Sequence, residues 1–230
     1  MILKQLSSKY CHPQILKFVL KTIEMLIPVG TASDKTTPGF YDAPQTAFLL
    51  LDFHTAFIEK ATSPEVRKAL QVAANLRSWA KTQGIQVIHC TVNVNDTPSP
   101  TCKDGQRLLG TIAAMKTSGG EEASELLEDF DGDVTFMRKP GHVSALKSPG
   151  LEEYLQKRGI CSLLLAGLST SGCVMRTAFA ACDAEYVVSV VSDGCADPVE
   201  GMHDILVKEV LNKRGYVVTA AEILGNDSRM

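Results

Sequence analysis

The sequence predicts an α/β fold of three layers, in which helices cover both faces of a central, mainly parallel, six-stranded sheet. Apolar runs of strand length alternate with capped helical segments about six times along the chain. Several runs, such as residues 46–51 and 163–166, are continuously apolar, which is typical of strands buried on both faces. A chain of 230 residues with 45% hydrophobic content is long enough to bury one full core.

The first half of the pattern begins with the apolar run 46–51, which ends in Asp52. Ser63 and Pro64 then provide a cap and a first-position proline for a helix that runs to about residue 82. A second strand follows at 85–92. The less regular segment 93–120 could form a loop over a ligand crevice.

The second half repeats the order of strand and helix. Its expected elements are a strand at 133–139, a helix from 148 to 158, a strand at 163–166, a tight turn at 167–172, a helix at 174–184, a strand at 186–193 and a helix from 197 to about 214. Asp197 and Glu200 have the spacing of a capping box for the last helix. Asp193 and the glycine after it are typical of a turn, so the position of Asp193 at a strand end needs no catalytic role.

The N-terminus predicts a separate extension, residues 1–44, ahead of a domain at 45–230. Residues 15–27 have the spacing of an amphipathic helix, with too many charges for a membrane span and no signal-peptide pattern. The net charge of -3 and the absence of a basic stripe argue against a nucleic-acid partner. Seven cysteines without a Cys-x-x-Cys pair are typical of a cytoplasmic protein. We expect a small-molecule substrate and a homo-oligomer, either a dimer or a tetramer.

A possible reactive thiol lies between the strand at 163–166 and the helix that follows. Cys173 is placed in the first turn of that helix, where free amides and the helix dipole favour an anion, so its pKa is expected to lie well below that of a free thiol. A buried, inert cysteine is the alternative. Asp52 and Lys139 each follow a strand, and the carboxyl ends of parallel strands share one crevice. A carboxylate there could take the thiol proton, and a lysine could hold the thiolate.

The segments 163–182, 186–197 and 215–222 resemble the cysteine hydrolases of the isochorismatase-like superfamily, and the resemblance extends from about Gln45 to Leu224. It implies a catalytic triad of Asp52, Lys139 and Cys173. It also implies a cis peptide between Leu168 and Ser169, which would turn the amides of Ser169 and Cys173 toward one oxyanion.

The sequence departs from the superfamily pattern near the first and second strands. The run after Asp52 reads Phe-His54 in place of glutamine and a second acid, and residues 92–100 lack the histidines with which nicotinamidases bind a metal. Asp52 and His54 alone would make a poor metal site. We therefore expect neither a metal nor another cofactor, and we expect Phe57, Arg107 and His142 to contact substrate.

The favoured function is hydrolysis of a C-N bond in a small amide or ureido compound through a cysteine thioester. Two alternatives stay open: an isochorismatase-type hydrolase of a non-amide substrate, and a binding or regulatory protein that retains the fold without turnover. Nucleotide binding is disfavoured because the turn at 167–172 lacks phosphate-loop spacing. Of the other histidines, His89 is expected in the core, and His12 and His203 in solvent.

Overall fold

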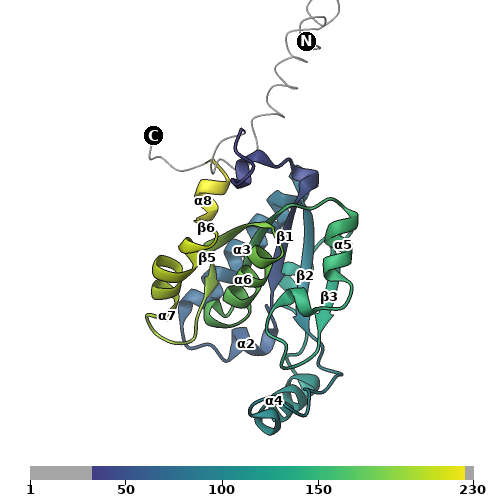
Figure 1. Cartoon of the computed structure of the whole chain (residues 1–230). Helices are drawn as coiled ribbons and strands as arrows, with labels where there is room; N and C mark the ends of the chain where they lie inside the picture. Colours follow the sequence, from purple (N-terminus) through teal and green to yellow (C-terminus); the bar gives the residue numbers. More distant parts are fainter. Residues whose placement is uncertain (1–32, 226–230) are drawn as a thin grey trace, which may run out of the picture.

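The computed structural model describes residues 33–225 and contains a single six-stranded parallel sheet with the strand order β3-β2-β1-β4-β5-β6 (Figure 1). The predicted fold class is therefore confirmed. The expected helix at 15–27 lies outside the described residues. Among the helices of residues 33–225, none is long and apolar enough to cross a membrane.

The strands are short and mostly buried. They are β1 (Thr46–Leu51), β2 (Gln86–Val92), β3 (Val134–Arg138), β4 (Ser162–Leu168), β5 (Val187–Ala196) and β6 (Tyr216–Val218). The main helices are α2 (Thr55–Glu59), α3 (Pro64–Gln83), α4 (Gly105–Thr117), α5 (Leu151–Lys157), α6 (Met175–Asp183), α7 (Met202–Ile205) and α8 (Ala220–Ile223). The short turns η1 (Pro38–Phe40) and η2 (Ala43–Gln45) precede β1.

Two apolar cores lie on opposite faces of the sheet because alternate residues of each strand point to opposite sides. Phe48 and Leu50 of β1 pack on the face covered by α3, whereas Leu49 and Leu51 pack on the face covered by α5 and α6 (Figure 1). Every residue of β1 is buried. This burial on both faces explains the unbroken apolar run in the sequence.

The structure differs from the expected elements at four places. The segment 93–120 contains the helix α4, which lies beyond the carboxyl ends of the strands (Figure 1). Glycines with positive φ, Gly150 and Gly201, precede α5 and α7, so α5 does not begin at Ser148 and α7 does not begin at Asp197, the first residues of the two expected helices. The strand β5 continues through Asp193, whose carboxylate accepts a hydrogen bond from the Ala220 amide at 2.9 Å.

The strand order places a crevice at the carboxyl ends of β1 and β4. The chain builds the sheet outward from β1 through β2 to β3, then returns to the other side of β1 with β4. Such a reversal leaves a crevice where ligands bind in open α/β sheets. At this point Gly167 pairs with Leu51, and a Cβ at Gly167 would lie only 2.4 Å from the Leu51 carbonyl oxygen. Glycine is thus required for β1 and β4 to approach each other here.

Candidate active site

Cys173 lies immediately beyond β4, in a turn between the strand and α6. This turn, η5 (Thr170–Val174), is kinked at Gly172, and the Leu168–Ser169 peptide before it is cis, at the bond for which the resemblance implies a cis form. The Ser171 amide donates a hydrogen bond to the Asp197 carboxylate at 2.7 Å. Asp197 thus anchors the turn instead of capping a helix.

Asp52 enters the crevice from the end of β1. Its φ of 56° lies in the left-handed region, which aspartate tolerates better than most residues, and its amide donates to the Cys90 carbonyl at 3.0 Å. The negative charge of the carboxylate is close enough to Cys173 to raise the pKa of its thiol. Asp52 and Cys173 are 4% and 3% exposed. The structure therefore brings together two of the three residues that the sequence predicts for the triad.

The cation beside Asp52 is Arg138, the last residue of β3. Its Nη1 donates to Asp52 Oδ1 at 2.8 Å, its Nη2 donates to Asp52 Oδ2, and its Nε donates to the His142 carbonyl at 2.8 Å. Burial alone would lower the pKa of Arg138, but the charge and hydrogen bonds of Asp52 outweigh burial and raise it. The guanidinium therefore stays charged and holds the carboxylate with both of its terminal nitrogens.

Lys139 is not brought into this group. It follows Arg138 directly and is half-buried, it does not line the crevice, and among residues 33–225 its ammonium has no ion-pair partner. Strand alternation explains the difference. Val134, Phe136 and Arg138 share the face of β3 that packs toward α5 and α6, and a neighbour in sequence points the other way. Counting every second residue from Val134 would have selected Arg138 from the sequence.

The pKa of the Cys173 thiol is raised, and the expected lowering is wrong. Burial is the largest cause and the negative charge of Asp52 adds to it, while Arg138 and a hydrogen bond from Thr177 act in the opposite direction. The sequence argument considered the helix terminus but not the removal of the thiol from water, which disfavours its charged form. In the resting site the sulfur is thus a neutral thiol beside a carboxylate.

His54 has a structural role that the sequence did not reveal. Its Nε2 accepts a hydrogen bond from the Val92 amide at 3.1 Å, so the proton of a neutral ring lies on Nδ1, which donates to the Gly120 carbonyl at 2.7 Å. Both ring nitrogens are occupied, and the ring ties the segment after α4 to the end of β2. His54 is therefore not available as a metal ligand in this conformation.

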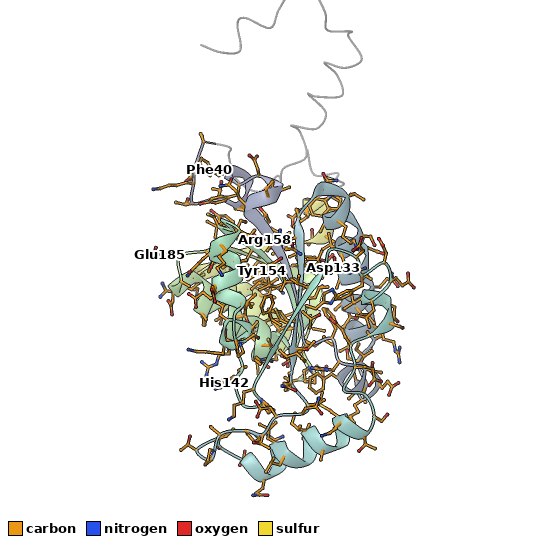
Figure 2. The ribbon with its side chains drawn as sticks, turned by 90° about the vertical axis from the view of Figure 1, so that its right-hand side faces the viewer. Phe40, Asp133, His142, Tyr154, Arg158 and Glu185 are labelled. Atoms are coloured by element: carbon orange, nitrogen blue, oxygen red, sulfur yellow. The ribbon has the colours of Figure 1, made fainter. Side chains whose placement is uncertain are left out.

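Asp52, Arg138 and Cys173 lie in a cleft of about 820 Å³. Most of its other walls are apolar, from Ala56, Phe57, Val66, Val92, Leu108, Val143 and Pro198. Phe57 and His142, two of the predicted substrate contacts, line the cleft, and His142 lies on the loop that follows β3, at the end of the sheet facing α4 (Figure 2). The third, Arg107, is exposed on α4 and does not line the cleft. The cations that line the cleft besides Arg138 are Lys60 and Lys103.

Two other histidines can be placed. His89 is buried as predicted, with Nδ1 2.8 Å from Glu122 and Nε2 3.2 Å from Asp133. His203 is half-buried and not fully solvated: its Nδ1 lies 2.8 Å from the Thr170 hydroxyl, and burial lowers its pKa. Within residues 33–225 no group of three or more His, Cys, Asp or Glu side chains is arranged to hold a metal ion. That turnover needs no metal stays a prediction.

The raised pKa of one buried thiol, Cys195, predicts that the protein loses stability in alkaline solution. Burial raises the pKa of Cys195 from an ordinary value of 9.0 to about 12, so above pH 9 the unfolded chain releases a proton that the folded chain retains. The free energy of unfolding should therefore fall by up to about 1.4 kcal/mol per pH unit for this group above pH ~9. Urea unfolding from pH 7 to 10.5 should show a shallower decline in Cys195→Ala than in the wild type. Equal slopes would contradict the prediction.

Comparisons with known proteins identify the family of the chain. The family model named isochorismatase domain matches residues 46–222. Maleamate amidohydrolase from Pseudomonas putida is 28% identical over 193 residues, which cover 81% of this chain and 87% of that protein. A protein from Arabidopsis thaliana named as a probable inactive nicotinamidase is 25% identical over 182 residues, covering 73% of this chain and 88% of that protein.

A solved structure supports the fold independently. The structure of a cysteine hydrolase from Pseudomonas syringae pv. phaseolicola aligns with a TM-score of 0.69 at 20% sequence identity, covering 81% of this chain and 93% of that one. At this identity the similarity shows the fold alone.

Proposed function

Because the chain belongs to the isochorismatase family of hydrolases, we propose that it hydrolyses a C-N bond of a small amide or ureido substrate through a thioester on Cys173. One observation carries the proposal: a buried carboxylate, Asp52, is paired with the guanidinium of Arg138 and lines the same largely apolar cleft as Cys173, close enough for its charge to act on the thiol. A purely structural cysteine has no need of a paired carboxylate facing its sulfur.

In the first half of the reaction, Cys173 Sγ attacks the substrate carbonyl carbon as the thiol proton passes to Asp52. A C-S bond forms, and the carbonyl π electrons move to oxygen, where the amides of Ser169 and Cys173 are proposed to bind the oxyanion. When the carbonyl forms again, the C-N bond breaks and Asp52 gives its proton to the departing nitrogen. Ammonia or an amine leaves, and an acyl thioester stays on Cys173.

In the second half, water attacks the thioester carbonyl while Asp52 takes a proton from that water. The C-S bond breaks with its electron pair returning to sulfur, Asp52 returns the proton to the sulfur, and a carboxylic or carbamic acid is released. A neutral resting thiol suits this cycle, because the carboxylate proposed to remove its proton lies in the same buried site, close enough for its charge to act on the thiol.

Arg138 takes the place that the sequence suggested for Lys139. Its fixed charge lies close enough to lower the cost of forming a thiolate, and its two bonds to Asp52 orient the carboxylate toward the thiol. A guanidinium does not exchange its proton in the working pH range, so proton transfer is assigned to Asp52 alone.

The test is release of ammonia or amine from a panel of small amides. The panel should include maleamate and nicotinamide, after the names of the two relatives, and N-carbamoyl amino acids. Rapid acid quenching and intact mass measurement should detect an acyl adduct, which digestion should locate on Cys173. Turnover without any adduct on Cys173, or no turnover across amide and ureido compounds, would contradict the proposal; the second result would favour a binding role or a non-amide substrate.

Variants at positions 138 and 139 should separate the two neighbouring cations. Lys139→Ala is expected to keep kcat/KM within about threefold of the wild type, because its side chain has no contact with the site. Arg138→Lys keeps the charge but cannot form both hydrogen bonds that the guanidinium makes to Asp52, so kcat/KM should fall by about tenfold or more. Steady-state ammonia release measures both, with Lys116→Ala on α4 as a surface control. A tenfold loss in Lys139→Ala would return the role to Lys139.

A further inference from the structure

A buried hydroxyl lies against the sulfur of Cys173. Thr177 lies one helical turn after Cys173, in α6, and is fully buried. Its Oγ1 is 3.7 Å from Cys173 Sγ. Residues four apart on a helix face the same side, which brings this pair together. Neither the family match nor the triad argument assigns Thr177 a role.

The partners of Thr177 determine which atom donates in this contact. The Ala145 amide, which can only donate, gives its hydrogen to Thr177 Oγ1 at 2.9 Å. The proposed proton transfer requires the Cys173 thiol hydrogen to point toward Asp52, whose charge acts on the thiol. With the thiol hydrogen directed to the carboxylate, the Thr177 hydroxyl hydrogen is the one that can lie between oxygen and sulfur. The bonds then run in one direction, from the Ala145 amide through Thr177 and Cys173 to Asp52.

Two other threonines show what Thr177 does differently. Thr111 and Thr117 in α4 each donate back to the carbonyl four residues earlier, at 3.2 and 3.1 Å, which is the common arrangement for threonine in a helix. In the described structure Thr177 makes no such bond to the Cys173 carbonyl. Its hydroxyl is directed at the sulfur instead.

We infer that Thr177 is a positioning residue, whose hydroxyl orients Cys173 Sγ toward Asp52 and stabilises the thiolate that forms during attack. The inference rests on the proposed function, because it matters only if Cys173 is the nucleophile. The Ala145 amide also links this hydroxyl to the segment after β3, so the thiol is held against the segment that follows Arg138. A sulfur that has given up its proton gains most from the contact, since hydrogen bonds to charged acceptors are the stronger ones.

The rate of alkylation at Cys173 tests this inference. The wild type and Thr177→Val, which has nearly the same shape without the hydroxyl, should be treated with iodoacetamide from pH 7 to 10, and each cysteine peptide quantified. Cys173 in Thr177→Val should react about tenfold more slowly at each pH, because a hydrogen bond to a charged group corresponds to about one pKa unit. Cys102, which lines the same cleft, serves as the internal reference and should keep its rate.

The Cys102 reference separates a specific effect from a structural one. If Thr177→Val merely loosened the site, both cysteines would react faster; a Cys173 rate that is unchanged or higher than in the wild type overturns the inference. Thr177→Ser, which restores the hydroxyl, should stay within about threefold of the wild type. If Thr177→Val does not fold, comparison of Thr177→Ser with Thr177→Ala answers the same question, and equal Cys173 rates overturn the inference.

Failure of the proposed function would look different. In that case Cys173→Ser would retain full turnover in the wild-type background, whatever the alkylation rates of the Thr177 variants.

Discussion

Cys173→Ser is expected to lower kcat/KM for the best amide of the panel by a factor on the order of 10³ or more. Serine keeps the size of the side chain and its contacts with Asp52 and Thr177, but an alcohol is a far weaker acid than a thiol and gives up its proton less readily to the same carboxylate. The side chain is buried and the substitution nearly isosteric, so the melting temperature should change little.

Steady-state ammonia release and intact mass measurement after acid quenching check this prediction, and the adduct on residue 173 should disappear with the activity. Cys161→Ser is the matched control, because Cys161 is half-buried, does not line the cleft and lies just before β4, whereas Cys173 lies just after it. Turnover within tenfold of the wild type in Cys173→Ser would rule out the thiol as nucleophile.

The sheet could be predicted because burial leaves a direct pattern in the sequence. Residues 47–51 before Asp52 are all apolar since β1 is covered on both faces, and Ser63 and Pro64 begin α3 as expected. The starts of α5 and α7 could not be predicted in this way. Each is set by a glycine with positive φ, while Asp197, which resembled a cap, binds the Ser171 amide.

The site was predictable in position but not in detail. The carboxyl ends of β1 and β4 meet in any sheet with this order, so Asp52 and Cys173 follow from the topology. The choice between Arg138 and Lys139 depends on which face of β3 each side chain occupies, and adjacent residues always differ in that respect. The raised pKa of Cys173 depends on burial and on the charge of Asp52 at close range, and neither can be read from the position of a residue in a helix.

Asp52→Asn is expected to lower turnover by a factor of at least ~10² and, in addition, to destabilise the fold. An amide cannot take the thiol proton, so both halves of the reaction lose their base. The same change leaves the buried guanidinium of Arg138 without its counter-charge, and breaking a buried pair in this way costs about 3–5 kcal/mol. Ammonia release at a temperature where the variant is folded, together with urea unfolding, measures the two effects separately.

A second substitution distinguishes the chemical role of Asp52 from its structural one. In Asp52→Asn with Arg138→Met, the unpaired charge is gone and an apolar chain of similar length fills its space, so much of the lost stability should return. Turnover should stay low, because the site still lacks a proton acceptor beside the sulfur. Recovery of activity together with stability would mean that Asp52 serves only to neutralise Arg138, and a folded Asp52→Asn variant with near-normal kcat would remove it from the reaction altogether.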